Sequence, residues 1–215
     1  MNAHAHPVPE QFDDPVQQRE AATLGMWAFL ATEILFFGVL FAGYTYCRVL
    51  FPQAFAAASR HTDMLLGTIE TAVLLTSSCA VALSVREVQL GGRRMAVALL
   101  GLAALLGTSF LVMHGFEYYA EYGEGLIPGI HYTQQGIYAR GIEVFYCLYY
   151  FITGFHSIHV AVGVALMLAM AWRTWHRAFD PDYHTPLELT ALYWHLVDIV
   201  WIFVYPVIYL VGRAG

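Results

Sequence analysis

Five apolar stretches, each long enough to cross a bilayer, constrain what this chain can fold into. They run at about Leu24–Tyr46, Met64–Val85, Met95–Gly115, Ile142–Trp172 and Leu187–Val211. A helix needs roughly 20 residues to span about 30 Å of hydrocarbon. The rival spanning structure is a closed β-barrel, whose strands alternate apolar and polar residues, and these unbroken runs lack that period. The stretches therefore predict an all-α integral membrane bundle of five transmembrane helices.

The composition agrees with a membrane protein and excludes other classes. Hydrophobic residues make up 59% of the 215 residues and charged residues only 12%, against roughly 25% in typical soluble domains. A net charge of −6 leaves no basic stripe for a nucleic-acid partner. The three cysteines are far apart and form no CxxC or CxxCH motif, so neither a disulfide framework nor covalent haem attachment is indicated.

The connections between the stretches predict the domain organisation and the orientation. Residues 1–19 hold prolines and acids without an apolar run, so we expect a polar cytoplasmic tail followed by one membrane domain over residues 20–215. Six arginines fall on the N-terminal side of the bundle and four on the other, with three of the six between residues 86 and 94. Arginine-rich short loops stay in the cytoplasm, so we expect the C-terminus outside. The segment 117–141 is expected to be one long outer loop.

Acids inside the predicted helices are candidate functional residues. A charged acid at the centre of a membrane helix costs about 2.5–3.5 kcal/mol on insertion scales, so it needs a partner, a proton or a water path. Glu33 and Glu70 lie well inside their stretches, where a neutral hydrogen-bonded acid and a functional one are equally consistent with the sequence. No Arg lies in any stretch, so we expect Glu33 to be neutral or connected to water. Glu143 and Glu188 stand at helix starts, where the helix dipole favours a carboxylate.

Three polar pairs recur at a spacing of three residues, which places both members of a pair on one helical face. The pairs are His114 with Glu117, His156 with His159, and His195 with Asp198. Such a pair can chelate a metal, relay protons, or form interhelical hydrogen bonds worth about 0.6–2 kcal/mol each. Spacing alone favours the hydrogen bonds that lock a bundle. We therefore expect no catalytic, cofactor-binding or metal-binding residue in this chain.

Small residues along the third and fourth stretches predict where the helices approach one another closely. They are Gly101, Ala104, Thr108 and Gly115 in the third, and Gly154, Ser157, Ala161 and Ala165 in the fourth. Such stripes are typical of a packed bundle rather than an open pore. On these residues alone, the chain fits an accessory subunit of a larger complex as well as a small proton-coupled transporter.

Four sequence blocks carry a more specific pattern. Residues 193–201 read YWHLVDIVW, and residues 153–160 read TGFHSIHV. Residues 25–37 place Glu33 before Ile-Leu-Phe-Phe, and residues 106–119 run from Leu-Gly to Glu-Tyr-Tyr. In order and spacing these blocks resemble the YWHFVDVVW, TGFHGLHV, GxxxFxxSExxFF and LGxxFxxxQxxEYY motifs of subunit III of the haem-copper oxidases. The likeness covers most of residues 20–212 and is to the short, five-helix bacterial form.

The resemblance implies a subunit of a proton-pumping terminal oxidase, either a cytochrome c oxidase or a quinol oxidase, in a bacterial inner membrane. In that family subunit III is non-catalytic and carries no haem or copper, which lie in partner subunits. It packs directly on subunit I in a complex that also contains subunit II, binds phospholipid, and supports proton uptake. The alternatives are a subunit III-like partner of a nitric oxide reductase and a free-standing proton-coupled transporter.

The resemblance also bears on individual residues. It implies that Glu33 is the family's buried helix carboxylate, and that the polar bundle residues are His156, His159, His195 and Asp198. Glu70, His114 and Glu117 complete the set of buried polar candidates for a proton-linked or lipid-linked role. The chain departs from the family pattern at His114, where Gln is frequent, and at Pro206, which interrupts the last stretch.

Overall fold

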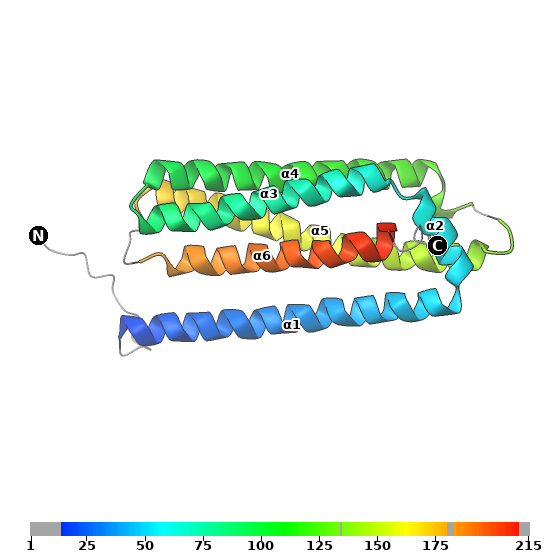
Figure 1. Ribbon diagram of the computed structural model, residues 1–215, viewed down its shortest axis with the longest axis horizontal. Helices are drawn as coiled ribbons and strands as arrows, with labels where there is room; N and C mark the ends of the chain where they lie inside the picture. Colours follow the sequence, from blue (N-terminus) through cyan, green and yellow to red (C-terminus); the bar gives the residue numbers. More distant parts are fainter. Residues whose placement is uncertain (1–13, 134, 180–182, 211–215) are drawn as a thin grey trace, which may run out of the picture.

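Long helices account for nearly all of the chain in the computed structural model, which describes residues 14–133, 135–179 and 183–210 (Figure 1). The helices are α1 (Pro15–Leu50), α2 (Pro52–His61), α3 (Met64–Gln89), α4 (Arg93–Gly123), α5 (Ala139–Trp175) and α6 (Thr185–Tyr205), followed by the π-helical turn η1 (Pro206–Leu210). Five helices are long and apolar enough to cross a membrane, the last of them being α6 continued by η1. The predicted all-α bundle is confirmed.

Proline and aspartate define where several helices begin. The Asp14 carboxylate accepts a hydrogen bond from the backbone N–H of Gln17 at 2.7 Å, with Pro15 in the first helical position. The Asp63 carboxylate caps α3 in the same way. Because α1 begins at Pro15, its first turns lie within the segment 1–19 that was expected to be a polar tail, whose residues 1–13 lie outside the described residues.

The expected long loop is shorter than predicted. Helix α4 continues to Gly123, two turns beyond Gly115, and α5 begins at Ala139. Strand β1 (Leu126–Ile127) pairs antiparallel with β2 (His131–Tyr132) in the connection between them. The prediction placed the end of the helix where the apolar run stops at Gly115 and the start of the loop at Glu117, whereas α4 continues with the side chains of Glu117 and Glu121 buried.

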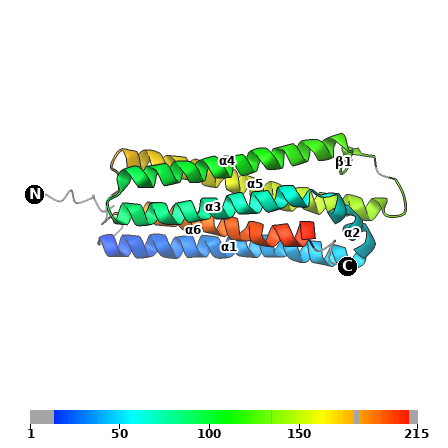
Figure 2. The ribbon, with the colours of Figure 1, turned by 45° about the horizontal axis from the view of Figure 1, so that its top comes forward.

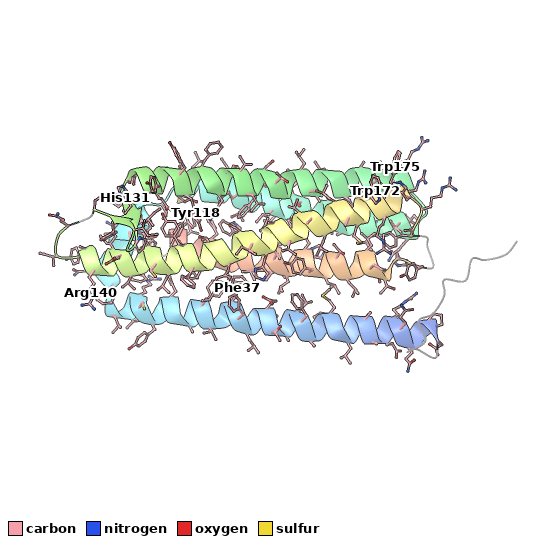
Figure 3. The ribbon with its side chains drawn as sticks, turned by 180° about the vertical axis from the view of Figure 1, so that it is seen from behind. Phe37, Tyr118, His131, Arg140, Trp172 and Trp175 are labelled. Atoms are coloured by element: carbon pink, nitrogen blue, oxygen red, sulfur yellow. The ribbon has the colours of Figure 1, made fainter. Side chains whose placement is uncertain are left out.

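Helices α3, α4, α5 and α6 form the packed bundle, and α1 lies along it against α5 and α6 (Figures 1 and 2). The short helix α2, which the apolar pattern did not predict, covers one end of the bundle. There Ser59 donates a hydrogen bond to the carbonyl of Ile208 at 2.7 Å. Trp172 and Trp175 lie at one end of α5 and Arg140 at the other (Figure 3).

Trp194 of α6 is one of two tryptophans buried in the bundle, and two glycines make room for it. A Cβ atom on Gly163 of α5 would lie 2.5 Å from the Trp194 ring, and one on Gly107 of α4 would lie 2.8 Å away. Gly101 and Gly115 are exposed with no atom near the Cβ position, so their predicted role as helix contacts is wrong. The size of the facing Trp194 ring therefore explains why positions 107 and 163 hold glycine.

We predict that Gly163→Ala destabilises the bundle by about 1–3 kcal/mol, because the added methyl group overlaps the Trp194 ring and the helices must move apart. Gly101→Ala is the matched control, since its methyl group enters open space and alanine favours a helix. Unfolding of the purified chain in detergent measures both effects. Equal stability of the two variants would contradict the assignment of Gly163 as a packing residue.

Candidate functional site

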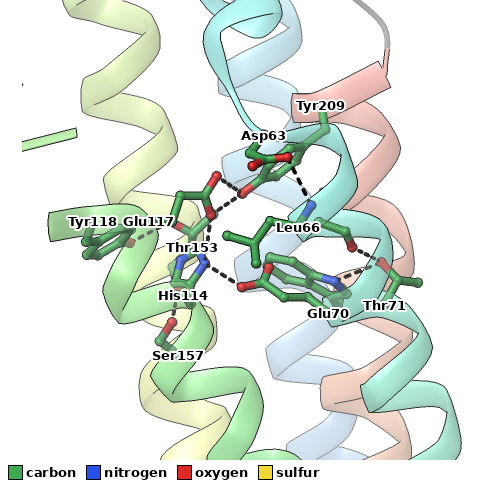
Figure 4. A network of polar contacts seen from close by, with 12 residues as sticks. Asp63, Leu66, Glu70, Thr71, His114, Glu117, Tyr118, Thr153, Ser157 and Tyr209 are labelled. Atoms are coloured by element: carbon green, nitrogen blue, oxygen red, sulfur yellow. Dashed lines mark hydrogen bonds and ion pairs between the residues drawn. The ribbon is translucent and has the colours of Figure 1, made fainter. Parts of the chain in front are cut away.

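Four polar side chains from three segments meet inside the bundle, and we call them the Glu70 cluster: Glu70, His114, Glu117 and Tyr209 (Figure 4). His114 Nδ1 lies 3.3 Å from Glu117 Oε2 and 3.7 Å from Glu70 Oε1. The Tyr209 hydroxyl donates to the Glu117 carboxylate, at 2.9 and 2.8 Å from its two oxygens. The cluster joins α3, α4 and η1, and all four residues are buried.

Aromatic rings hold His114 in place. Its imidazole stacks on Phe110 with ring centroids 5.7 Å apart, and it contacts the rings of Tyr118 and Trp201 at 4.7 and 5.7 Å. Tyr118 is in turn fixed by a 2.6 Å hydrogen bond between its hydroxyl and that of Thr153 on α5. The imidazole therefore packs against three aromatic rings, with Nδ1 within 3.7 Å of both carboxylates.

Several polar atoms of the cluster lack hydrogen bonds. Among the described residues, neither oxygen of Glu70 and neither nitrogen of His114 has a hydrogen-bond partner. The same holds for both oxygens of Glu121, one turn beyond Glu117 on α4. A buried polar group without a hydrogen bond lowers the stability of the fold, and a buried charge without a partner lowers it further. Glu70, His114 and Glu117 each bring one atom to within 4.8 Å of the others, which is the arrangement of groups able to hold a metal ion.

A second polar contact joins α1 to α5. His159 Nε2 lies 3.0 Å from Glu33 Oε2, and His159 Nδ1 lies 2.7 Å from the backbone carbonyl of Phe155. A carbonyl can only accept, so Nδ1 carries hydrogen and the remaining proton is shared between Nε2 and the Glu33 carboxyl group. Tyr193 of α6 donates to the His159 carbonyl at 3.1 Å. Both members of the Glu33–His159 pair are half-buried.

A third contact joins α6 to α3. His195 Nδ1 lies 2.7 Å from Ser78 Oγ. Asp198 is buried one turn further along α6, and its Oδ1 has no hydrogen-bond partner within the described ranges. His156 differs from the other predicted histidines, because neither of its ring nitrogens bonds to a described residue and the imidazole stacks on Trp201 at 5.0 Å. His156 is therefore a packing residue in this bundle.

The structure brings together polar residues of different helices, which the spacing along a single helix could not relate to one another. Glu70 meets the predicted His114–Glu117 pair, and Glu33 meets His159 but not His156. Sequence reasoning missed Tyr209, Ser78 and Glu121. Glu121 follows Glu117 by four residues, so helical spacing could have identified it. Tyr209 and Ser78 contact their partners on other helices, so only the packed structure identifies them.

Comparisons with known proteins place the chain in a family. Residues 12–213 match the family model described as cytochrome c oxidase subunit III. The chain is 29% identical to cytochrome bo(3) ubiquinol oxidase subunit 3 of Pseudomonas aeruginosa, covering 98% of this chain and 94% of that protein. It is 28% identical to cytochrome c oxidase subunit 3 of Thermostichus vulcanus, covering 99% and 92%. Quinol oxidase subunit 3 of Bacillus spizizenii is also 28% identical, covering 89% and 88%. The chain, a multi-pass membrane protein by its five apolar helices, therefore belongs to the cytochrome c oxidase subunit III family.

Proposed function

We propose that this chain is the non-catalytic subunit III of a proton-pumping haem-copper terminal oxidase, which reduces oxygen to water in a bacterial inner membrane. It packs directly on subunit I, next to subunit II, and stabilises the catalytic subunit, which holds the haem and copper. It binds phospholipid and supports proton uptake by the complex. Relatives named as subunit 3 of cytochrome c oxidase and of quinol oxidases support this proposal equally for the two electron donors.

The observation that carries the proposal is that polar side chains inside the bundle form hydrogen bonds between different helices. Glu33 bonds to His159, His195 to Ser78, and the Trp201 N–H to the Thr71 hydroxyl at 3.1 Å. Each contact joins two helices, as expected for a rigid accessory subunit. Helix α1 buries few of its side chains within this chain and presents apolar residues outward, which suits contact with subunit I or lipid.

The arginine-rich end of the bundle supports both the orientation and the lipid site. The α3–α4 turn and the C-terminal end of α5 lie at the same end as the start of α1 (Figure 1). A cavity of about 690 Å³ there is lined by Arg93, Arg94, Arg177 and Phe179, among others. Arg177 adopts φ 59°, a left-handed conformation that is uncommon outside glycine. We assign this end to the cytoplasmic side, where the cavity accepts the headgroup of an anionic phospholipid.

We predict that the chain, purified in mild detergent from its native membrane, brings haem-containing subunits with it. The same polypeptide produced alone should bind no haem or copper centre, because in the described part of the chain the one grouping of His, Cys, Asp and Glu side chains close enough to share a metal is Glu70, His114 and Glu117, which is neither a pair of axial histidines nor a Cys–His–Met set. The absorption spectrum and a copper assay measure this. A stoichiometric Soret band in the isolated chain would overturn the non-catalytic assignment. Transport activity of the isolated chain would favour the transporter instead.

We predict that Glu33→Gln leaves assembly and initial turnover close to the wild-type values, because the amide keeps the shape and can donate to His159 Nε2. His159→Leu should instead weaken assembly, since it removes an interhelical hydrogen bond worth about 0.6–1.7 kcal/mol. Asp198→Leu should do the same at α6, because Ser78 of α3 is a side-chain hydrogen-bond partner of the Asp198 carboxyl group. Yield of intact complex and oxygen consumption measure these effects.

The same variant separates a structural from a proton-conducting Glu33. Turnover is measured at about pH 6 and about pH 9, where proton supply differs most. A proton-conducting carboxyl group would make Glu33→Gln slow at the higher pH. A large, pH-dependent fall in the initial rate would therefore contradict the structural role of the Glu33–His159 pair.

We predict that the double variant Arg94→Ala/Arg177→Gly loses anionic phospholipid that co-purifies with the wild-type protein. Each arginine near a membrane surface contributes about 1 kcal/mol, so affinity should fall about fivefold for each charge removed. Glycine suits the left-handed conformation at Arg177, so the backbone should not be strained. Arg140→Ala, at the opposite end of α5, is the control, and mass spectrometry counts the lipid. Equal lipid retention in both variants would refute the site.

A further inference from the structure

The Glu70 cluster places more acidic than basic side chains in the interior of a membrane bundle. Two carboxylates, from Glu70 on α3 and Glu117 on α4, face one imidazole. In the described part of the chain, the ion pairs of both carboxylates go to His114. A protonated imidazole between two ionised carboxylates leaves a net charge of −1 in a medium of low dielectric constant. The net charge reaches zero either when one carboxyl group takes a proton or when a dication lies between two carboxylates and a neutral imidazole, so the distances between the groups distinguish the two arrangements.

The distances also differ from those of a charge-assisted hydrogen bond. Such bonds between nitrogen and a carboxylate are about 2.7–2.9 Å long. His114 Nδ1 lies 3.3 Å from Glu117 and 3.7 Å from Glu70, and neither contact qualifies as a hydrogen bond. Two ligands of one tetrahedral zinc ion, with metal–ligand distances of about 2.0–2.1 Å, lie roughly 3.3–3.4 Å apart. The His114–Glu117 separation equals that value, the His114–Glu70 separation is a few tenths of an ångström longer, and one atom from each of the three residues lies within 4.8 Å of the others.

We propose that Glu70, His114 and Glu117 bind one divalent transition-metal ion of the zinc type. One imidazole and two carboxylates are ligands that Zn²⁺ accepts, whereas Ca²⁺ requires six to eight oxygens and Mg²⁺ an octahedral set. Water completes the fourth position. From the spacing of residues along single helices we expected no metal ligand in this chain, and the proposed site differs from that expectation.

The surroundings of the three ligands match those of a metal site. Tyr209 donates its hydroxyl hydrogen to the Glu117 carboxylate and so fixes its orientation, as groups around metal ligands commonly do. The rings of Phe110 and Tyr118 fix the imidazole. Glu121 lies one turn nearer the end of α4, where Tyr149 and Tyr150 of α5 are the nearest hydrogen-bonding groups to its carboxyl group. The bound ion would join α3 to α4 near the end that α2 covers.

The test measures zinc in the full-length chain with its co-purifying subunits. The preparation is stripped with a chelator, reloaded with Zn²⁺ alone and freed of unbound metal. The wild type should retain one more zinc per chain than Glu70→Gln, a variant that keeps the side-chain shape but removes an anionic ligand. Asp198→Asn is the matched control, because it also changes a buried acid to an amide, and it should retain as much zinc as the wild type. Metal held by other subunits cancels in these differences.

Two further measurements keep the test decisive if Glu70→Gln does not fold. Tyr209→Phe should bind Zn²⁺ about 10–100-fold more weakly, because it removes a hydrogen bond that orients a ligand rather than the ligand itself. Co²⁺ in the wild type should give the intense visible bands of four-coordinate cobalt, and Zn²⁺ should abolish them. Equal zinc in wild type and folded Glu70→Gln, or wild type without a saturable cobalt spectrum, would overturn the proposal. Neither result depends on the oxidase function.

Discussion

Ionisable side chains inside hydrocarbon are the constraint on which the rest of this structure depends. A membrane interior supplies little water to solvate a carboxylate or an imidazole, so a partner on a neighbouring helix lowers the free-energy cost of burying such a group. Glu33 bonds to His159, His195 bonds to Ser78, and His114 contacts both Glu70 and Glu117. These contacts fix how each helix is rotated about its axis. Apolar packing alone would permit several rotations, because lipid tails are as apolar as leucine.

The two carboxylate–histidine sites have different geometry, and this difference separates their roles. The Glu33–His159 contact is a 3.0 Å hydrogen bond between a helix at the edge and the bundle, half-buried, with one proton shared. The Glu70 cluster is fully enclosed, holds two acids for one imidazole, and has longer separations. The first arrangement is complete without any added group. The second has two acids facing one imidazole at separations longer than a charge-assisted hydrogen bond, and a metal is therefore proposed for the second site and not for the first.

Shape determines how closely the helices approach as much as polarity does. Trp194 occupies the volume that Gly107 and Gly163 leave, and its position brings α4, α5 and α6 together along the middle of the bundle. Helix α1 lies against α5 and α6 through fewer buried side chains, among them Glu33 and Phe37 against His159 and Tyr44 against Phe145. A subunit built in this way has a rigid core of four helices and one helix whose outward face is left for lipid or another subunit.

The sequence by itself determined the five membrane helices, the all-α class and the family, because apolar length and ordered motifs are local properties of the chain. It also indicated the His114–Glu117 pair, since a spacing of three residues places both on one helical face. Only the tertiary structure decided that Glu70 and Tyr209 join this pair, that Glu33 faces His159, and that Gly163 rather than Gly101 is a contact. Those outcomes depend on the rotation and approach of helices distant in sequence, and helical periodicity fixes neither. The boundary of α4 was misjudged for the same reason, because buried acids are tolerated there by groups on other helices.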